Sequence, residues 1–254
     1  MKTIGRRFFL TLALAFALPA MASAKQSEPS EVMVVASIHG YHAQSATFTY
    51  DDLYRLVAAF RPDAVGVEIR QSDLAQPDEV LARSYPKEMI DLARQYGEKS
   101  FGFDWLGDDV PPAPLPANWW RENSRIFALQ KAFGEDAEMS DERNPLKQRH
   151  TEMGQRQLQI VADATAAQLA DGRYDEISEA RYAVFDVMTL GTPYEALARF
   201  YRQRDAKIAE NVLAYVRANR GQRIVIVTGA DHHGPLVRAL SQYPDEIKLK
   251  PVTP

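Results

Sequence analysis

Three short apolar runs in this chain each lead into a residue with acid–base or metal-ligating chemistry, and this repeated design limits the possible folds. The runs and the residues that follow them are 32–37 with His39, 64–67 with Glu68, and 223–228 with His232. Short continuous apolar runs bounded by turn residues are typical of buried strands. In open α/β sheets, ligands bind outside the carboxyl ends of the strands. If the three runs are parallel neighbours, these side chains converge on one crevice.

The segments between the runs have the periodicity of helices. Apolar residues recur at helical spacing in 50–60 and again in 85–96, and residues 100–105 have the pattern of another short strand. Strand–helix–strand–helix–strand is the order that builds a parallel sheet. The sequence therefore predicts an α/β fold, with a largely parallel sheet flanked by helices, in which residues 32–37 pair with 64–69.

The middle of the chain has a different pattern. The proline-rich stretch 110–116 can continue neither a helix nor an interior strand, so it predicts a stiff connector. Residues 117–190 are helical in pattern throughout, and we expect a helical cap insertion over the crevice, with Trp119 or Trp120 touching the substrate. The remaining predicted elements are a helix after Pro193 that runs to about Asn219, a strand at 223–228, a helix at 235–242 and an edge strand at 247–252.

Residues 1–24 have the layout of a secretory signal peptide, with a basic start, an apolar centre and the small residues Ala22-Ser23-Ala24 at the cleavage site. The stretch Arg6-Arg7-Phe8-Phe9-Leu10 also resembles a twin-arginine export signal, so the export route stays open. Residues 25–254 are long enough for a single domain with a hydrophobic core. No other apolar run reaches the roughly 18 residues that span a bilayer. We therefore expect a periplasmic or secreted protein without a membrane span.

Net charge and the lack of cysteine exclude several classes of protein. The formal charge is −4, and removal of the predicted signal, which has three basic and no acidic residues, changes it to −7. Nucleic-acid binding calls for a basic surface, so the expected partner is a small molecule or a peptide, with the oligomeric state left open. Because the chain has no cysteine, thiol nucleophiles, cysteine–zinc sites and disulfides are excluded.

The polar ends of the first two runs each allow a functional and a structural interpretation. His39 lies just past its strand, where it either faces the crevice or bonds to the backbone of its loop. His42 is either a second ligand from the same turn or a solvated loop residue. Glu68 follows four apolar residues, where a carboxylate is costly to bury unless it is paired or functional. In the structural alternative, Glu68 is a solvated strand end that pairs with Arg70.

The last run ends in a denser motif, Gly229-Ala230-Asp231-His232-His233-Gly234. Adjacent histidines cannot both face the same way, and we assign His232 to the crevice because Gly229-Ala230-Asp231-His232 keeps the spacing of Ala36-Ser37-Ile38-His39. We then expect His233 to face solvent or the start of the next helix. Asp231 either orients an imidazole from behind or caps that helix.

Two more polar residues are candidates for the same crevice. Asp104 ends the strand pattern at 100–105 and is a fourth polar group at a strand end. Arg204 belongs to the long late helix. It either points along that helix into the crevice, where a guanidinium binds an anionic group or a developing oxyanion, or it lies on a solvated face.

These residues together resemble the superfamily that contains TraB-type pheromone shutdown proteins, TIKI metalloproteases, ChaN haem-binding proteins and erythromycin esterases. Its members share a strand-end Gly-x-x-His, a downstream strand-end Glu, an Arg on a late helix, and a second Gly-x-x-His followed by a glycine. The matching positions here are Ala36-Ser37-Ile38-His39, Glu68, Arg204, and Gly229-Ala230-Asp231-His232 with Gly234. The resemblance covers about 30–105 and 195–242, and Ala36 stands where the first glycine is usual.

The resemblance implies an exported hydrolase that cleaves an ester or amide bond. The chain has neither a cysteine nor a Gly-x-Ser-x-Gly elbow, so we expect attack by water rather than by an enzyme nucleophile. In a metal-dependent version, His39, Glu68 and His232 hold a divalent ion such as manganese, zinc or cobalt, which activates the water. In a metal-free version, His39 or Glu68 takes the water proton and Arg204 steadies the oxyanion. Asp231 then supports the site from its position beside His232.

The same superfamily also implies a rival without catalysis. A ChaN-like member binds haem or iron non-covalently, and His39, His232 or Tyr41 are then the candidate ligands. A member that has lost activity and acts as a scaffold is a further alternative, which intact His39, Glu68 and His232 count against.

Overall fold

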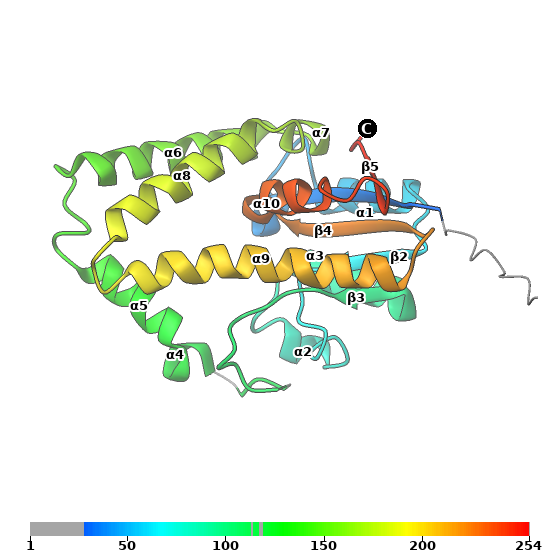
Figure 1. Ribbon diagram of the computed structural model, residues 1–254, viewed down its shortest axis with the longest axis horizontal. Coiled ribbons are helices and arrows are strands. Elements are labelled where there is room, and N and C mark those ends of the chain that lie inside the picture. The colour runs from blue at the N-terminus through cyan, green and yellow to red at the C-terminus, as the bar shows by residue number, and fades with distance from the viewer. Residues whose placement is uncertain (1–27, 113, 117–118, 254) are drawn as a thin grey trace, which may run out of the picture.

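The computed structural model describes residues 28–112, 114–116 and 119–253, so the predicted signal peptide at 1–24 lies outside the described residues. Its centre is a sheet of five strands, all parallel, in the order β3-β2-β4-β1-β5 (Figure 1). The strands are β1 (Ser30–Ser37), β2 (Ala64–Val67), β3 (Ser100–Gly102), β4 (Arg223–Gly229) and β5 (Ile247–Lys250). The predicted α/β fold with a parallel sheet and flanking helices is confirmed.

One predicted pairing is wrong, because β4 lies between β1 and β2. Ile226 is paired with Val34 on one side and with Gly66 on the other. All but the first residue of β4 are buried, and a parallel strand covered on both faces belongs in the middle of its sheet. The three strands that carry the candidate residues are therefore still neighbours, in the order β2, β4, β1.

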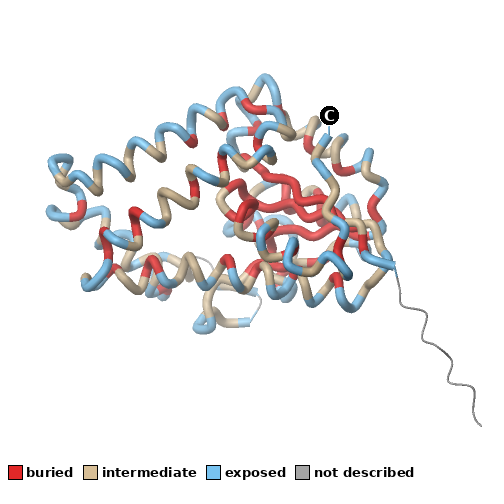
Figure 2. Tube along the Cα trace, turned by 45° about the horizontal axis from the view of Figure 1, so that its top comes forward, coloured by how far each residue is buried: buried red, intermediate tan, exposed pale blue. Residues whose placement is uncertain are grey.

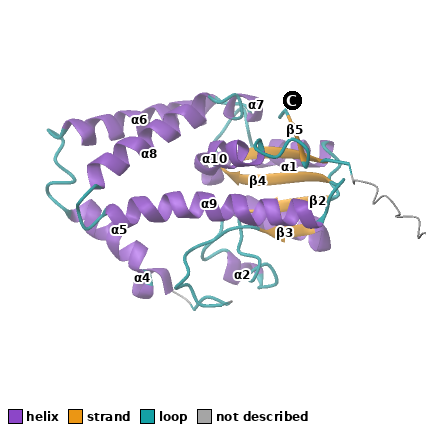
Figure 3. Cartoon of the chain, viewed as in Figure 1, coloured by secondary structure: helices purple, strands orange, loops and turns teal. Residues whose placement is uncertain are grey.

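Helices cover both faces of the sheet (Figure 3). The flanking helices are α1 (Tyr50–Ala59), α2 (Asp78–Leu81), α3 (Lys87–Tyr96), α9 (Glu195–Ala218) and α10 (Ala230–Leu240). Helices α1 to α3 pack on the face that includes Val35 and Val227, while α9 and α10 pack on the face that includes Val34 and Ile226. The apolar positions of the strands alternate between these two cores, and the buried chain is concentrated there (Figure 2).

The ends of two helices follow local rules. Thr49 caps α1 with a reciprocal bond to Asp52, and Gly97 ends α3 at a φ of 53°. The last helix, however, begins at Ala230 and not near the predicted residue 235, and Pro235 lies inside it. Both histidines of the last motif therefore belong to the first turns of α10.

The region predicted as a cap consists of helices, and its described residues contain no strand. The helices are α4 (Trp119–Asn123), α5 (Arg125–Glu135), α6 (Pro145–Asp163), α7 (Ala166–Leu169) and α8 (Arg173–Thr189). Figure 1 shows α6 and α8 extending side by side away from the sheet, while α9 runs the length of the molecule. The first half of α9 packs with Phe185 in a small core of the cap, and its second half packs on the sheet. Helix α9 thus carries its middle residues to the junction of cap and sheet.

In the described part of the chain, no helix has both the length and the apolar character needed to cross a membrane.

Candidate functional site

The structure brings three predicted residues together at the carboxyl edge of the sheet. His39, Glu68 and His232 line one cavity of about 420 Å³. Arg204 and Asp231 also contribute to its wall. The cavity lies where parallel α/β sheets usually bind their ligands.

His39 is held in place by a buried carboxylate. It begins the short 3-10 helix His39–Ala43 with a φ of 50°, a left-handed conformation that is uncommon outside glycine. Its Nδ1 lies 2.8 Å from Oε1 of Glu88, in the first turn of α3. Ser37 Oγ accepts a bond from the His39 backbone N–H and donates one to Glu88. The imidazole is therefore fixed through Nδ1, although 41% of its side chain remains exposed.

Gly229 makes room for the other ring nitrogen of His39. A Cβ at residue 229 would lie 2.6 Å from His39 Nε2 and 3.5 Å from Glu68 Oε2. The φ of Gly229 is −57°, which any residue can adopt. The first glycine of the last motif is therefore required by this close approach and not by its backbone conformation. The same contact shows that His39 Nε2 faces the ends of β4 and β2.

Both carboxylate oxygens of Glu68 accept hydrogen bonds. Oε2 accepts from Thr228 Oγ1 at 2.8 Å and from the backbone N–H of Gly229 at 2.6 Å, and Oε1 accepts from Arg204 Nη2 at 2.8 Å. Burial by itself would raise the pKa of Glu68, but the positive charges around it and the Gly229 amide outweigh burial and lower the pKa to about 2. Glu68 is therefore ionised at neutral pH.

The guanidinium of Arg204 bonds to three other side chains of the site. Its Nε donates to Asp104 Oδ1 at 3.0 Å, Nη2 donates to Glu68, and Nη1 donates to Nε2 of His232 at 2.9 Å. Burial would lower the pKa of Arg204, but the two carboxylates raise it above its ordinary value. For Asp104, burial together with the charge of Glu68 raises the pKa to about 6, although Arg204 opposes this.

His232 repeats the design of His39. It lies in the first turn of α10, and its Nδ1 is 2.6 Å from Oδ1 of Asp205. Burial would lower the pKa of His232, but Glu68 and Asp205 raise it above the ordinary value against the opposing charge of Arg204. The hydrogen bond from Arg204 requires an unprotonated Nε2, so it exists only in the neutral imidazole with the proton on Nδ1.

Two histidine–carboxylate pairs thus flank Glu68. They are His39–Glu88 and His232–Asp205. In each pair the carboxylate holds Nδ1 and leaves Nε2 for the site, which is how proteins orient a histidine that exchanges protons or binds a metal. For His39, burial lowers the pKa, but the bond to Glu88 and the charges of Glu68 and Glu88 raise it above the ordinary value.

Neither Glu88 nor Asp205 was assigned to the site by the sequence analysis. Glu88 follows Lys87 at a helix start, where an acidic residue is favoured by the helix dipole whatever its function. Only the fold brings it under His39. Asp205 does carry a signal, because it directly follows Arg204 within the stretch that resembles the superfamily. Successive helix residues point about 100° apart, so Arg204 reaches Glu68 and His232 Nε2 while Asp205 reaches His232 Nδ1.

The two remaining histidines near the site have structural roles. His42 is buried, its Nδ1 donates to the Phe48 carbonyl at 2.7 Å, and its Nε2 accepts from the Ile38 N–H at 3.2 Å. Burial lowers its pKa, so it is a neutral core residue, and both predicted alternatives, ligand and solvated loop residue, are wrong. His233 is also buried, with Nδ1 bound to Asp175 of α8 at 3.0 Å. The expected solvent-facing position is wrong because α10 begins earlier and α8 covers it.

Asp231 follows neither of its two predicted alternatives. Its Oδ1 accepts hydrogen bonds from three cap side chains at 2.8 to 3.0 Å, namely Gln157, Tyr174 and Ser178. The imidazole of His232 is oriented by Asp205 instead. Asp231 therefore ties the cap to the first turn of α10. The structural alternative for Glu68 is also not observed, because Arg70 pairs with Asp73.

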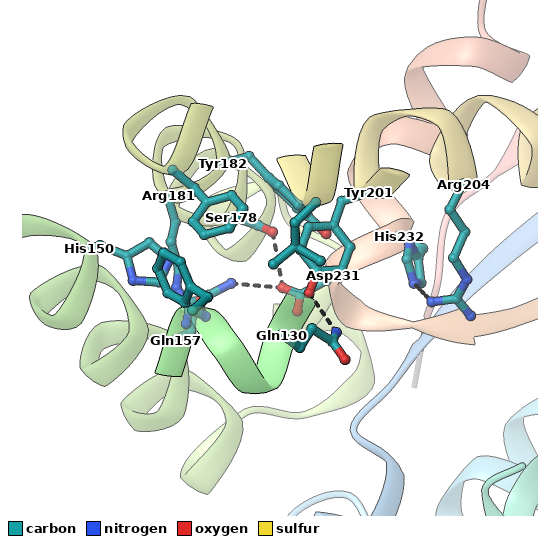
Figure 4. A pocket seen from close by; sticks show the side chains of 13 residues that line it. Gln130, His150, Gln157, Ser178, Arg181, Tyr182, Tyr201, Arg204, Asp231 and His232 are labelled. Atoms are coloured by element: carbon teal, nitrogen blue, oxygen red, sulfur yellow. Dashed lines mark hydrogen bonds between the residues drawn. The ribbon is translucent and has the colours of Figure 1, made fainter. Parts of the chain in front are cut away.

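A second cavity of about 400 Å³ lies between the cap helices and the same wall (Figure 4). Arg204 and His232 line both cavities. The cap helices α6 and α8 also contribute to both, so they line the crevice as expected. Trp119 and Trp120 instead line a separate pocket beside Arg83.

The residues present do not fit a divalent metal ion in this arrangement. The guanidinium of Arg204 donates to His232 Nε2 and to Glu68 Oε1, which are two of the expected ligand atoms. A positive guanidinium at that position repels a dication. Among the described residues, no group of three or more His, Asp or Glu side chains is arranged to hold a metal ion.

A porphyrin fits this wall no better. Tyr41, which is 52% exposed, lines the cavity together with His39. The rest of that wall includes charged side chains, among them Glu68, Arg181 and Arg204. An apolar macrocycle placed there would bury these charges against its faces, which is costly.

Fold and site together define an α/β protein with a buried histidine–carboxylate–arginine cluster at the carboxyl edge of its sheet. The chain matches no protein-family model, no curated protein and no solved structure. The resemblance to the TraB, TIKI, ChaN and erythromycin esterase superfamily therefore stays a prediction from the sequence motifs.

Proposed function

We propose that this protein is a hydrolase that cleaves an ester or amide bond by attack of water, with His39 as the general base and without a metal ion. The observation that carries the proposal is the placement of His39. Its Nδ1 is anchored to a fully buried carboxylate while its side chain is 41% exposed in the cavity. A general base needs both a fixed orientation and access to the water whose proton it takes.

The charges around His39 suit this role. When Nε2 takes a proton, the imidazolium that forms is stabilised by Glu88 behind it and by ionised Glu68 in front of it. The raised pKa of His39 means that the base is active above that pKa, where the ring is neutral. Glu68 is a poor base, because a carboxylate with a pKa of about 2 has little affinity for protons.

Arg204 supplies the positive charge for the oxyanion. The site holds its guanidinium with Glu68, Asp104 and His232, and its Nη1 retains a second N–H with no acceptor among the described residues. Arg204 lines both cavities, so a substrate in either one would lie beside its guanidinium. A donor that is fixed in advance stabilises a developing oxyanion without reorganising.

The test combines metal analysis with hydrolysis of a panel of esters and amides by purified protein. We expect activity that survives a chelator, and a loss of about 100-fold or more in His39→Ala and in Arg204→Gln. The matched control is Arg202→Gln, two positions before Arg204 on the same helix, because Arg202 pairs with Glu179 and Asp186 outside the cluster. Activity that requires a stoichiometric metal would refute the metal-free mechanism. Full activity in His39→Ala would refute the site, and a Soret band would point to haem binding.

A further inference from the structure

Several residues line both cavities, and one of them is Arg181, a cationic residue of the cap. Arg181 belongs to α8, and it lines both the cavity beside His39 and the cavity under the cap. Its guanidinium lies against the backbone of α6, since a Cβ at Gly154 would be 3.3 Å from its Cζ. Figure 4 shows it across the cap cavity from Arg204 and His232.

Arg181 has no ionic partner among the described residues. Nη1 donates to the neutral amide oxygen of Gln157 at 2.8 Å, and the buried Nε has no hydrogen-bond partner in the described part of the chain. Arg204 and Arg202, by contrast, each pair with two carboxylates. A partly buried guanidinium without a carboxylate is costly, and its fork of donors matches a carboxylate ligand.

The neighbours of Arg181 leave this position open to an anion. Asp231 lines the same wall, but Gln157 Nε2, Tyr174 and Ser178 already donate to its Oδ1. Gln157 stands between the two charges, with its amide nitrogen on Asp231 and its oxygen on Arg181. Burial, with the charges of Arg181 and Lys147, lowers the pKa of His150 to about 4, so that ring is neutral at pH 7.

Beside Arg181 the cap cavity is mainly aromatic. Its apolar wall consists of Phe133, Tyr182, Phe185, Leu197 and Tyr201. Phe133 and Phe185 meet edge to face with ring centroids 5.4 Å apart. Aromatic rings in such a wall favour an aromatic or aliphatic group of the ligand.

We propose that the site takes a substrate with a free carboxylate next to an apolar side chain, as in an N-acylated amino acid or the C-terminal residue of a peptide. Arg181 binds the carboxylate, the aromatic wall takes the apolar side chain, and the scissile amide lies toward Arg204 and His39. This inference rests on the proposed hydrolysis for the identity of the scissile bond, but the carboxylate subsite can be tested by binding alone.

The test measures the affinity of N-acetylphenylalanine and of its neutral counterpart, N-acetylphenylalanine amide, by calorimetry. The protein carries His39→Ala, so that neither probe is consumed. We expect the carboxylate to bind at least about tenfold more tightly than the amide, and Arg181→Met in the same background to abolish the difference. Arg173→Met, on the same helix but paired with Asp171 outside both cavities, is the matched control and should keep it.

Each outcome bears on the subsite separately from the chemistry. Equal affinity of the two probes, no binding of either at millimolar concentration, or a preference that survives in Arg181→Met overturns the carboxylate subsite. If the preference for the carboxylate probe depends on Arg181 but the wild-type protein hydrolyses nothing, the subsite is supported and the proposed function is refuted. If the wild-type protein hydrolyses esters or amides without any preference for carboxylates, the proposed function is supported and the subsite is refuted. Circular dichroism of Arg181→Met verifies its fold, and Arg181→Lys, which keeps the charge, should retain part of the preference.

Discussion

Replacement of Glu88 by glutamine tests the role of His39 without touching the exposed ring. Glu88 is fully buried, and its Oε1 is 2.8 Å from His39 Nδ1 and 2.7 Å from Ser37 Oγ. Glutamine keeps the shape and one acceptor but removes the negative charge behind the imidazole. We expect His39 to stay in place and to hold its proton less strongly.

The size of the effect follows from the contact. Hydrogen bonds to charged groups contribute about 1.5–3 kcal/mol. Because the imidazole is 41% exposed, we take the lower end, about 1.5 kcal/mol, which is about a tenfold change in proton affinity. The wild-type pKa of His39 is raised, so the neutral base accumulates only as pH rises through that raised pKa. Without the Glu88 charge the pKa falls, and the ascending limb of the pH–rate profile moves to lower pH.

The assay is kcat/KM against pH for wild type and Glu88→Gln, with the tautomer and titration of His39 followed by nitrogen-15 NMR. The plateau rate should also fall by about 10- to 100-fold, because the less basic ring takes the water proton less readily and is less well oriented. Asp91→Asn is the matched control, since Asp91 lies on the same helix but contacts Tyr54 and Lys87 away from the site. An ascending limb that stays in place, or moves to higher pH, would refute the assignment of His39 as the base.

Three further predictions follow from the structure. Gly229→Ala should displace the His39 ring and reduce activity by about 100-fold while the protein stays folded. Gly40→Ala should have wild-type activity, because among the described residues nothing beyond the local backbone lies within 4 Å of the added Cβ, and equal activities in the two variants would contradict the close approach. Glu68→Gln should lower the free energy of unfolding by about 3 kcal/mol, measured by urea titration, because it breaks a buried ion pair; an unchanged midpoint would count against that pairing. Protein from the native envelope should begin near Lys25 by mass spectrometry, and an intact Met1 would rule out signal cleavage.

The sequence was a good guide wherever a local pattern determines the structure. Continuous apolar runs predicted three parallel strands because both faces of this sheet are covered, so the runs have no polar alternation. Because the strands run in the same direction, the polar residues that follow them meet at one edge of the sheet, as the sequence predicted. The order of the strands was not predicted, since no local pattern states that β4 inserts between β1 and β2. Strand order is set by contacts between segments far apart in the chain, such as Ile226 with Val34 and with Gly66.

The partners of the site residues depended on contacts between distant segments. Glu88 is 49 residues from His39 in the sequence, and nothing in its helix start distinguishes it from an ordinary first-turn acid. Arg204 could be assigned only as a candidate, because its helix also presents exposed charges such as Arg199 on other faces. What selects Arg204 is its position in the middle of α9, where the helix passes from the cap core to the sheet.

The last motif shows why two predictions about it failed together. Because α10 begins at Ala230, successive residues of its first turn face different neighbours: Asp231 and His233 contact α8, while His232 contacts Arg204. A side chain in place of Gly234 would also clash with Asp175, because its Cβ would lie 2.8 Å from the Asp175 side chain. The turn that brings His232 to the site is therefore also the turn that binds the cap, so under the proposed function it sets the position of a cap-bound substrate relative to His232.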